Sequence, residues 1–127
     1  MTQKDLWNER YAERGALWGI GPNEFVTARV GGMSPCRVLD LGAGQGRNAI
    51  WMAQQGHNVT AVDVSDVATA QGKQIAAEAG VEVNFIAADL ATWEPVAESF
   101  DLVVLAYLQA PEPSRRALHA KAIRALA

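Results

Sequence analysis

The chain has 127 residues, of which 50% are hydrophobic and 20% charged, and its formal net charge is −3. This length and composition are typical of one globular domain and exclude a disordered chain or a second core of ordinary size. The acidic balance argues against a nucleic-acid-binding face, and the longest apolar run, Leu102–Leu108, is far short of the roughly 20 residues of a membrane span. We therefore expect a cytoplasmic domain without nucleic-acid or membrane partners.

The first 33 residues are expected to form an N-terminal helical cap of two short helices. In the first helix, Trp7 and Tyr11 recur at the spacing that places side chains on one helix face. Asn23 has a side chain that favours the N-cap position of the second helix, and Gly31–Gly32 would end that helix.

Residues 34–127 alternate between predicted strands and predicted helices. Strands are expected at residues 37–41, 58–64, 81–87 and 100–107, and helices at residues 47–55, 66–79 and from residue 111 onward. The strands are apolar on both faces, as in a parallel sheet that helices cover on both sides, so we expect an α/β fold. Ligands of such sheets bind at the carboxyl ends of the strands. The residues at those ends are Asp40–Gly46, Asp63, Asp89 and Tyr107.

A glycine-rich turn, Gly42–Gly46, follows the first strand. Its glycines let the backbone turn tightly and leave no side chain between the turn and a ligand. A dinucleotide-binding turn would have its third glycine where this chain has Arg47, whose side chain would obstruct a pyrophosphate. Asp40 would repel phosphate and attract an ammonium group. A ligand with an amine and no phosphate, such as S-adenosylmethionine, fits better, although such a turn can also be purely structural.

Two further acids follow strand ends. Asp63 comes close to the roughly 20-residue spacing at which an acid binds the ribose of a nucleotide, and its carboxylate can accept both ribose hydroxyls. The alternative is that Asp63 caps the next helix, a role that Ser65 can fill without it. Asp89, between Ala88 and Leu90, is placed to accept from the exocyclic amine of adenine, and the alternative is a solvated turn residue.

Together these residues resemble the motifs of class I S-adenosylmethionine-dependent methyltransferases. Val38–Gly46 resembles their first motif, Val62–Ser65 their ribose-binding motif and Ala88–Leu90 their adenine-binding motif. Trp7–Tyr11 and Tyr107–Pro111 are similar to the branch that contains the tellurite-resistance and thiopurine methyltransferases. The resemblance implies a Rossmann-like, doubly wound parallel sheet with strand order 3-2-1-4, and S-adenosyl-L-methionine as the cofactor.

The resemblance also implies which residues of the core (residues 34–127) and of the N-terminal cap bind the cofactor. Asp40 and the glycine turn would hold its methionine part, Asp63 its ribose, and Asp89 with Leu90 its adenine. Tyr107 would lie near the transferred methyl group, and no catalytic residue is identified. The full set is Asp40, Gly42, Ala43, Gly44, Gly46, Asn48, Asp63, Val64, Ala88, Asp89, Leu90 and Tyr107, with Trp7 and Tyr11 covering the cofactor from the first helix. The alternative for these two aromatic residues is plain helix packing.

Three other features receive ordinary interpretations. Cys36, the only cysteine, is expected to be a small buried residue, and His57 a surface residue without metal-ligand spacing to another donor. Lys121 is expected on a solvated basic face of the last helix, where cations complement the helix C-terminus. We therefore expect no metal site.

The resemblance ends with the helix after the fourth strand, so we expect the core to be incomplete at its C-terminal end. The strand at residues 100–107 would then be a long apolar edge, open to a second copy or another chain. Two functions remain: methyl transfer in line to a small thiol or oxyanion acceptor, or a non-catalytic module that binds S-adenosylmethionine or assembles with other chains. Arg47 and Asp40 argue against a third possibility, a nicotinamide-dependent oxidoreductase.

Overall fold

The computed structural model describes residues 2–14, 22–106 and 112–127. Each predicted helix and strand has a counterpart in this part of the chain. In chain order they are α1 (Gln3–Arg14), α2 (Glu24–Val30), β1 (Arg37–Leu41), α3 (Arg47–Gln54), β2 (Asn58–Asp63), α4 (Asp66–Glu78), β3 (Asn84–Ala87), β4 (Leu102–Val104) and α5 (Glu112–Ala125).

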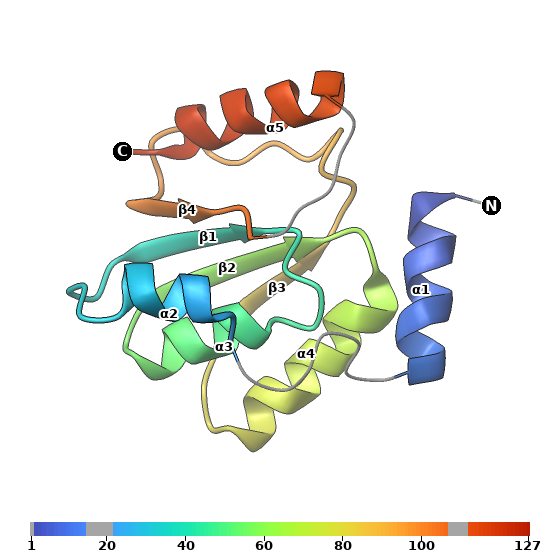
Figure 1. Cartoon of the computed structure of the whole chain (residues 1–127), viewed down its shortest axis with the longest axis horizontal. Coiled ribbons are helices and arrows are strands. Elements are labelled where there is room, and N and C mark those ends of the chain that lie inside the picture. The colour runs from blue at the N-terminus through green and yellow to red at the C-terminus, as the bar shows by residue number, and fades with distance from the viewer. Residues whose placement is uncertain (1, 15–21, 107–111) are drawn as a thin grey trace.

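The four strands form one parallel sheet with the order β3-β2-β1-β4 (Figure 1). In the central strand β1, Val38 lies opposite Val59 of β2 on one side and Leu102 of β4 on the other. β2 and β3 lie on one side of β1, and β4 lies on its other side. The carboxyl end of β1 is therefore the switch point in strand order, where such sheets bind ligands. The expected strand order and Rossmann-like architecture are confirmed.

Helices cover both faces of this sheet, and each face buries its own apolar cluster. Figure 1 shows α5 on one face and α2, α3 and α4 on the other, with α1 standing beside α4. Successive residues of β1 point to opposite faces. Val38 therefore packs with Met52 of α3, whereas Leu39 packs with Ala122 and Ala125 of α5. This double burial explains why the strands are apolar throughout rather than alternating.

The predicted N-caps of α2 and α4 are both present. The Asn23 side chain accepts a hydrogen bond from the Phe25 amide at 2.7 Å, and the Ser65 hydroxyl accepts one from the Ala68 amide at 3.0 Å. Each cap satisfies an amide that the first turn of a helix leaves without a partner. The predicted starts of these helices are therefore confirmed.

β2 ends one residue earlier than predicted, at Asp63, and two other strands are shorter by three residues or more. β3 begins at Asn84 because the chain before it still completes the end of α4, where the Val81 amide donates to the Ala76 carbonyl at 3.0 Å. β4 has only the three residues Leu102–Val104, since Phe100 instead forms an isolated bridge with Leu126 after α5. The expectation of a long edge strand at residues 100–107 is therefore wrong for its described residues, and Tyr107 lies outside them.

Candidate functional site

The glycine turn after β1 adopts backbone conformations that favour glycine. Gly42, Gly44 and Gly46 have φ angles of 73°, 59° and 81°, in the left-handed region that other residues rarely enter. The Gly42 amide donates to the Val62 carbonyl at 2.8 Å, which fastens the turn to β2. The turn therefore brings backbone groups rather than bulky side chains to the carboxyl edge of the sheet.

Gly46 is required by packing as well as by its conformation. A Cβ atom at Gly46 would lie 2.6 Å from Cε1 of Phe85, and a Cβ atom at Gly72 would lie 2.8 Å from the same atom. The buried Phe85 ring of β3 is thus held closely between the glycine turn and α4. The glycine pattern in the sequence gave no indication that Phe85 packs against Gly46.

Asp63, at the end of β2, joins two of the turns that surround the carboxyl edge. Its Oδ1 accepts a hydrogen bond from the Gly44 amide at 3.1 Å, and its Oδ2 accepts one from the Ser65 amide at 3.0 Å. Burial raises the pKa of Asp63, and these two hydrogen bonds oppose that effect. Each carboxylate oxygen has a second lone pair, so this fixed carboxylate can also accept from a ligand.

Asp40 is a buried acid of β1 that lacks a full set of partners. Its side chain is 2% exposed, and its Oδ2 has no hydrogen-bond partner within the described residues. Burial, together with the charge of Asp63, raises the pKa of Asp40 to about 7. A buried carboxylate without a partner is costly, and a cationic ligand group would relieve that cost. The residues present therefore fit the ammonium group of S-adenosylmethionine.

Asn48, in the first turn of α3, links the glycine turn to α2. Its side-chain Oδ1 accepts a hydrogen bond from the Asn23 amide at 2.7 Å, and the residue is buried. The oxygen of Asn48 thus positions the N-cap residue of α2. Its contact with a cofactor stays a prediction.

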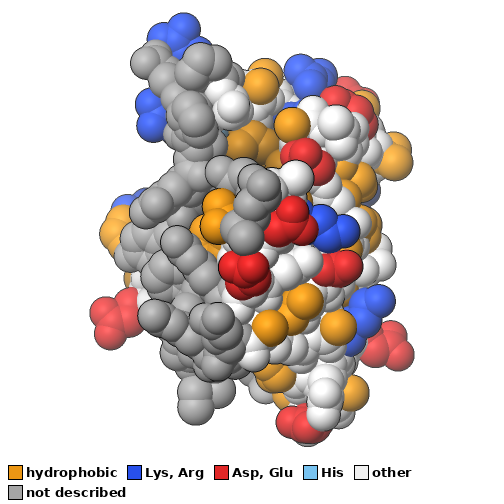
Figure 2. Space-filling model, turned by 90° about the vertical axis from the view of Figure 1, so that its right-hand side faces the viewer, with side chains coloured by type: hydrophobic (Ala, Val, Ile, Leu, Met, Phe, Trp, Pro, Cys, Tyr) orange, Lys and Arg blue, Asp and Glu red, His pale blue; other side chains and the backbone are white. Residues whose placement is uncertain are grey.

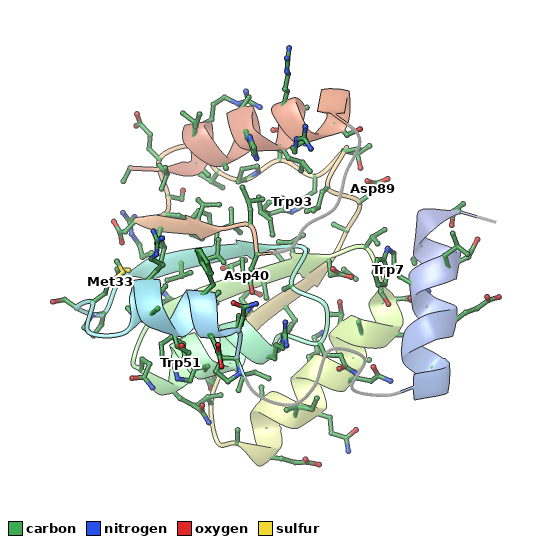
Figure 3. The ribbon with its side chains drawn as sticks, in the orientation of Figure 1. Trp7, Met33, Asp40, Trp51, Asp89 and Trp93 are labelled. Carbon is green, nitrogen blue, oxygen red and sulfur yellow. The ribbon has the colours of Figure 1, made fainter. Side chains whose placement is uncertain are left out.

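The helix α1 is attached to the start of α4 through Asn8. The Asn8 amide group donates to Oδ1 of Asp66 at 2.7 Å, and its Oδ1 accepts from the hydroxyl of Ser65. Trp7 is half-buried and lies between α1 and the chain that leads from β2 to α4 (Figure 3). The sequence motif around Trp7 drew attention to the aromatic residues and missed Asn8. Tyr11 belongs to α1, but its side chain lies outside the described residues.

Asp89 follows β3 and organises a turn of its own. The Ala88 amide before it donates to the Asp63 carbonyl at 2.8 Å, so the ends of β2 and β3 stay together. The exposed Asp89 side chain accepts from the Ala91 amide at 2.9 Å, and its carbonyl accepts from the Trp93 amide at 2.8 Å. Asp89 therefore stabilises this turn, and its hydrogen bond to adenine stays a prediction.

These residues lie along one edge of the molecule. The carboxyl ends of the strands, Asp89 and Trp7 lie toward the right in Figure 3, and Met33 lies at the opposite edge. Figure 2, which faces that right-hand side, shows acidic side chains near the middle of the surface, with hydrophobic side chains and a basic one beside them. Tyr107, expected at the same edge, lies outside the described residues.

At the opposite edge, the prediction for His57 is wrong. His57 is 5% exposed, and its Nδ1 accepts from the Cys36 amide at 3.0 Å and lies 3.6 Å from the Cys36 sulfur. Gly56, with a φ of 96°, turns the chain inward just before His57. Burial raises the pKa of the half-buried Cys36 thiol, with a further contribution from the charge of Asp101. The raised pKa favours the protonated form of the thiol.

Two other features are absent from the described residues. Within residues 2–14, 22–106 and 112–127, no group of three or more His, Cys, Asp or Glu residues could hold a metal ion. No helix in the same ranges is long and apolar enough to cross a membrane.

Residues 38–127 match the family model described as "Methyltransferase domain". The match covers the sheet from the second residue of β1 onward, the glycine turn and the three acids at the strand ends. The chain therefore belongs to this methyltransferase family, and the resemblance to class I methyltransferases is confirmed.

Two relatives that are named as methyltransferases agree with this membership. The chain is 34% identical over 114 residues to the ubiquinone biosynthesis O-methyltransferase of Pseudomonas fluorescens, covering 85% of this chain and 48% of that protein. It is 55% identical over 31 residues to the probable S-adenosyl-L-methionine-dependent methyltransferase TehB of Haemophilus influenzae, covering 24% of this chain and 11% of that protein. The chain thus spans less than half the length of these curated relatives.

Solved structures share the fold. A protein studied for the conversion of a disulfide bond into a thioacetal group during echinomycin biosynthesis superposes with a TM-score of 0.81 and 25% identity, covering 98% of this chain and 55% of that chain. Coclaurine N-methyltransferase bound to N-methylheliamine and SAH has a TM-score of 0.67 and 25% identity, covering 82% of this chain and 30% of that chain. S-adenosylmethionine is the methyl donor of this class of protein.

Proposed function

We propose that this chain binds S-adenosylmethionine at the carboxyl edge of its sheet and serves a methyltransferase that acts on a small thiol or oxyanion. The buried Asp40 carboxylate carries this proposal, because its Oδ2 lacks a partner among the described residues beside a turn built to admit a ligand. The family membership and a relative named as an O-methyltransferase support it.

The three acids have separate roles in this proposal. When bound, S-adenosylmethionine supplies a methyl group activated by the positive charge of its sulfur. Asp40 pairs with the ammonium group, and Asp63, which the Gly44 and Ser65 amides hold in place, accepts from the ribose hydroxyls. Asp89 accepts from the adenine amine. Fixing the cofactor at three points orients it for in-line transfer, which contributes to the rate because the reacting groups are already aligned.

The acceptor class follows from the roles given to these acids. Because all three acids bind the cofactor in this proposal, none of them is assigned as a general base. A thiolate or an oxyanion already carries the negative charge that makes it nucleophilic, so it needs no such base. The relative that contributes the longest alignment described above is named for a small-molecule substrate and methylates oxygen according to its name. Tyr107, proposed to lie near the methyl group, completes this part of the hypothesis.

The test is calorimetric titration of the chain with S-adenosylhomocysteine, with NAD as the comparison ligand. We expect binding of S-adenosylhomocysteine only, and we expect Asp63→Ala to weaken it more than about tenfold without changing the circular dichroism spectrum. Unchanged affinity in this variant would contradict the ribose assignment, and preference for NAD would contradict the proposal. Transfer of a labelled methyl group to a panel of thiols and oxyanions then tests the acceptor class. Binding without transfer would favour the non-catalytic module.

A further inference from the structure

Lys121 is a buried cation that is not among the residues proposed to contact the cofactor, and it binds the chain after β3. The residue is 5% exposed on the face of α5 that packs on the sheet, contrary to the solvated position expected from the sequence. Its Nζ donates to the carbonyls of Leu90 at 2.7 Å and Trp93 at 2.9 Å, and lies 3.4 Å from that of Ala91. The same nitrogen is 3.3 Å from the Glu94 carboxylate.

The segment that Lys121 binds is a single turn with helical character. Its N-terminal side is closed by Asp89, whose carboxylate accepts from the Ala91 amide and whose carbonyl accepts from the Trp93 amide. A turn of this kind leaves carbonyls without partners at its other end. Lys121 supplies the donors for those carbonyls, in the position where a cation is most favourable.

This arrangement links α5 to the site through the backbone. Asp89 and Lys121 bind opposite ends of the same short turn, so displacing one end changes the geometry of the other. Trp93 and Leu90 also pack against the apolar cluster shared by β1, β2 and α5, which leaves the turn little freedom to adjust. Figure 3 shows Trp93 below α5 and Asp89 at the far end of the segment, toward the carboxyl edge.

We propose that Lys121 is a positioning residue for adenine recognition, holding the turn from Asp89 to Trp93 so that the Asp89 carboxylate meets the exocyclic amine of the cofactor. This inference rests on the proposed function. It makes the last helix, which makes no contact with the cofactor in the proposal, a determinant of which base is bound.

The experiment compares two ligands on the full chain by calorimetry. One is S-adenosylhomocysteine, and the other is its analogue with unsubstituted purine, which lacks the exocyclic amine. The parent chain is expected to prefer the adenine ligand by about tenfold, the size expected for a hydrogen bond to a charged acceptor. Lys121→Met is expected to abolish most of this preference by weakening adenine binding, with little change for the purine analogue.

Arg124→Met is the matched control. Arg124 lies on the same helix and approaches the same Glu94 carboxylate at 3.8 Å, but its side chain is 58% exposed. This variant is expected to keep the full preference. Equal weakening of both ligands by Lys121→Met, or an unchanged preference, would overturn the inference while leaving the proposed function intact. If the parent chain binds neither ligand, the proposed function itself fails.

A second variant covers the case in which Lys121→Met does not fold. Lys121→Arg keeps the charge, but its planar guanidinium cannot place one nitrogen among the same carbonyls. We expect a folded protein with a preference reduced severalfold and faster hydrogen exchange at the Trp93 amide. A preference and an exchange rate equal to those of the parent would overturn the positioning role.

Discussion

Asp40 and Asp63 illustrate how one sheet edge gives two acids different tasks. Asp63 has both oxygens engaged by backbone amides, so its orientation is fixed before any ligand arrives. Asp40 is more deeply buried and has an oxygen without a partner among the described residues. Asp63 is thus a hydrogen-bond acceptor with a fixed orientation, whereas Asp40 is a destabilising group that a cation can neutralise.

This difference predicts opposite effects of Asp40→Asn on stability and on binding. The folded-state pKa of about 7 lies above the unfolded value, so the folded chain binds the extra proton and loses stability as the pH rises from about 4 to about 7. The variant removes that loss. We expect it to be more stable than the parent at pH 8, by on the order of 1–4 kcal/mol, and nearly equal near pH 4.

Denaturant unfolding at several pH values measures this effect without ligand. The affinity of the parent for S-adenosylhomocysteine should increase as Asp40 ionises between about pH 6 and 8, and the variant should bind weakly without that dependence. A variant that is less stable than the parent at every pH would show that Asp40 has a partner that supports the fold.

At the level of elements, the Asn8 side chain attaches α1 to the start of α4 by hydrogen bonds. Asn8→Ala removes the hydrogen bonds to Ser65 and Asp66. We expect α1 to detach and its amides to exchange faster. If Trp7 covers the cofactor as we propose, the affinity for S-adenosylhomocysteine should also decrease severalfold. The expected loss of stability is about 1–2 kcal/mol.

Lys4→Ala is the control for that variant. Lys4 approaches the same Asp66 carboxylate at 3.6 Å, but both side chains are about half exposed, so the pair contributes little. Hydrogen exchange monitored by mass spectrometry should distinguish the two. If α1 exchanges equally fast in both variants, or is unaffected by Asn8→Ala, the attachment depends on other contacts.

The order of the elements could be predicted from the sequence because its signals are local. Apolar runs marked the strands, and Asn23 and Ser65 marked helix starts by side-chain chemistry that acts within one turn. The partners of Asn8 and Lys121 could not be predicted, since these contacts join residues 57 and 31 positions apart. The helical period does place Lys121 three residues after Leu118 and four before Ala125, but it gives no information on the carbonyls that its ammonium group contacts.

The predicted ends of β3 and β4 were wrong for a related reason. An apolar run predicts which residues can be buried in a strand but gives no information on where the neighbouring strand stops pairing with it. At Phe100 the chain pairs with Leu126, a residue after the last helix, and this competing contact is visible only in three dimensions.

At the scale of the whole molecule, β4 forms one edge of the described sheet and has β1 as its neighbour. The Asp101 amide donates to the Arg37 carbonyl of β1, so by alternation the backbone groups of Leu102 and Val104 point outward. We expect weak, concentration-dependent pairing through this short edge, with a second copy or with another chain.

Val104→Pro tests this expectation because it removes an outward amide and preserves the bonds to β1. Light scattering after size exclusion should show a mass that increases with concentration for the parent but not for the variant. Val103→Pro, which removes an inward amide, should instead reduce the free energy of unfolding. A mass independent of concentration in the parent would exclude self-pairing.

The Phe85 ring has a consequence for how this protein can vary in evolution. Gly46 and Gly72 belong to different elements, yet both leave space for the same aromatic atom. A smaller side chain at position 85 would not by itself admit a larger residue, because Gly46 needs its left-handed backbone and a Cβ atom at Gly72 would lie 2.6 Å from the Gln45 carbonyl oxygen. Both glycines should therefore be retained among homologues, and the shape of the glycine turn depends on a strand residue that makes no contact with the cofactor in our proposal.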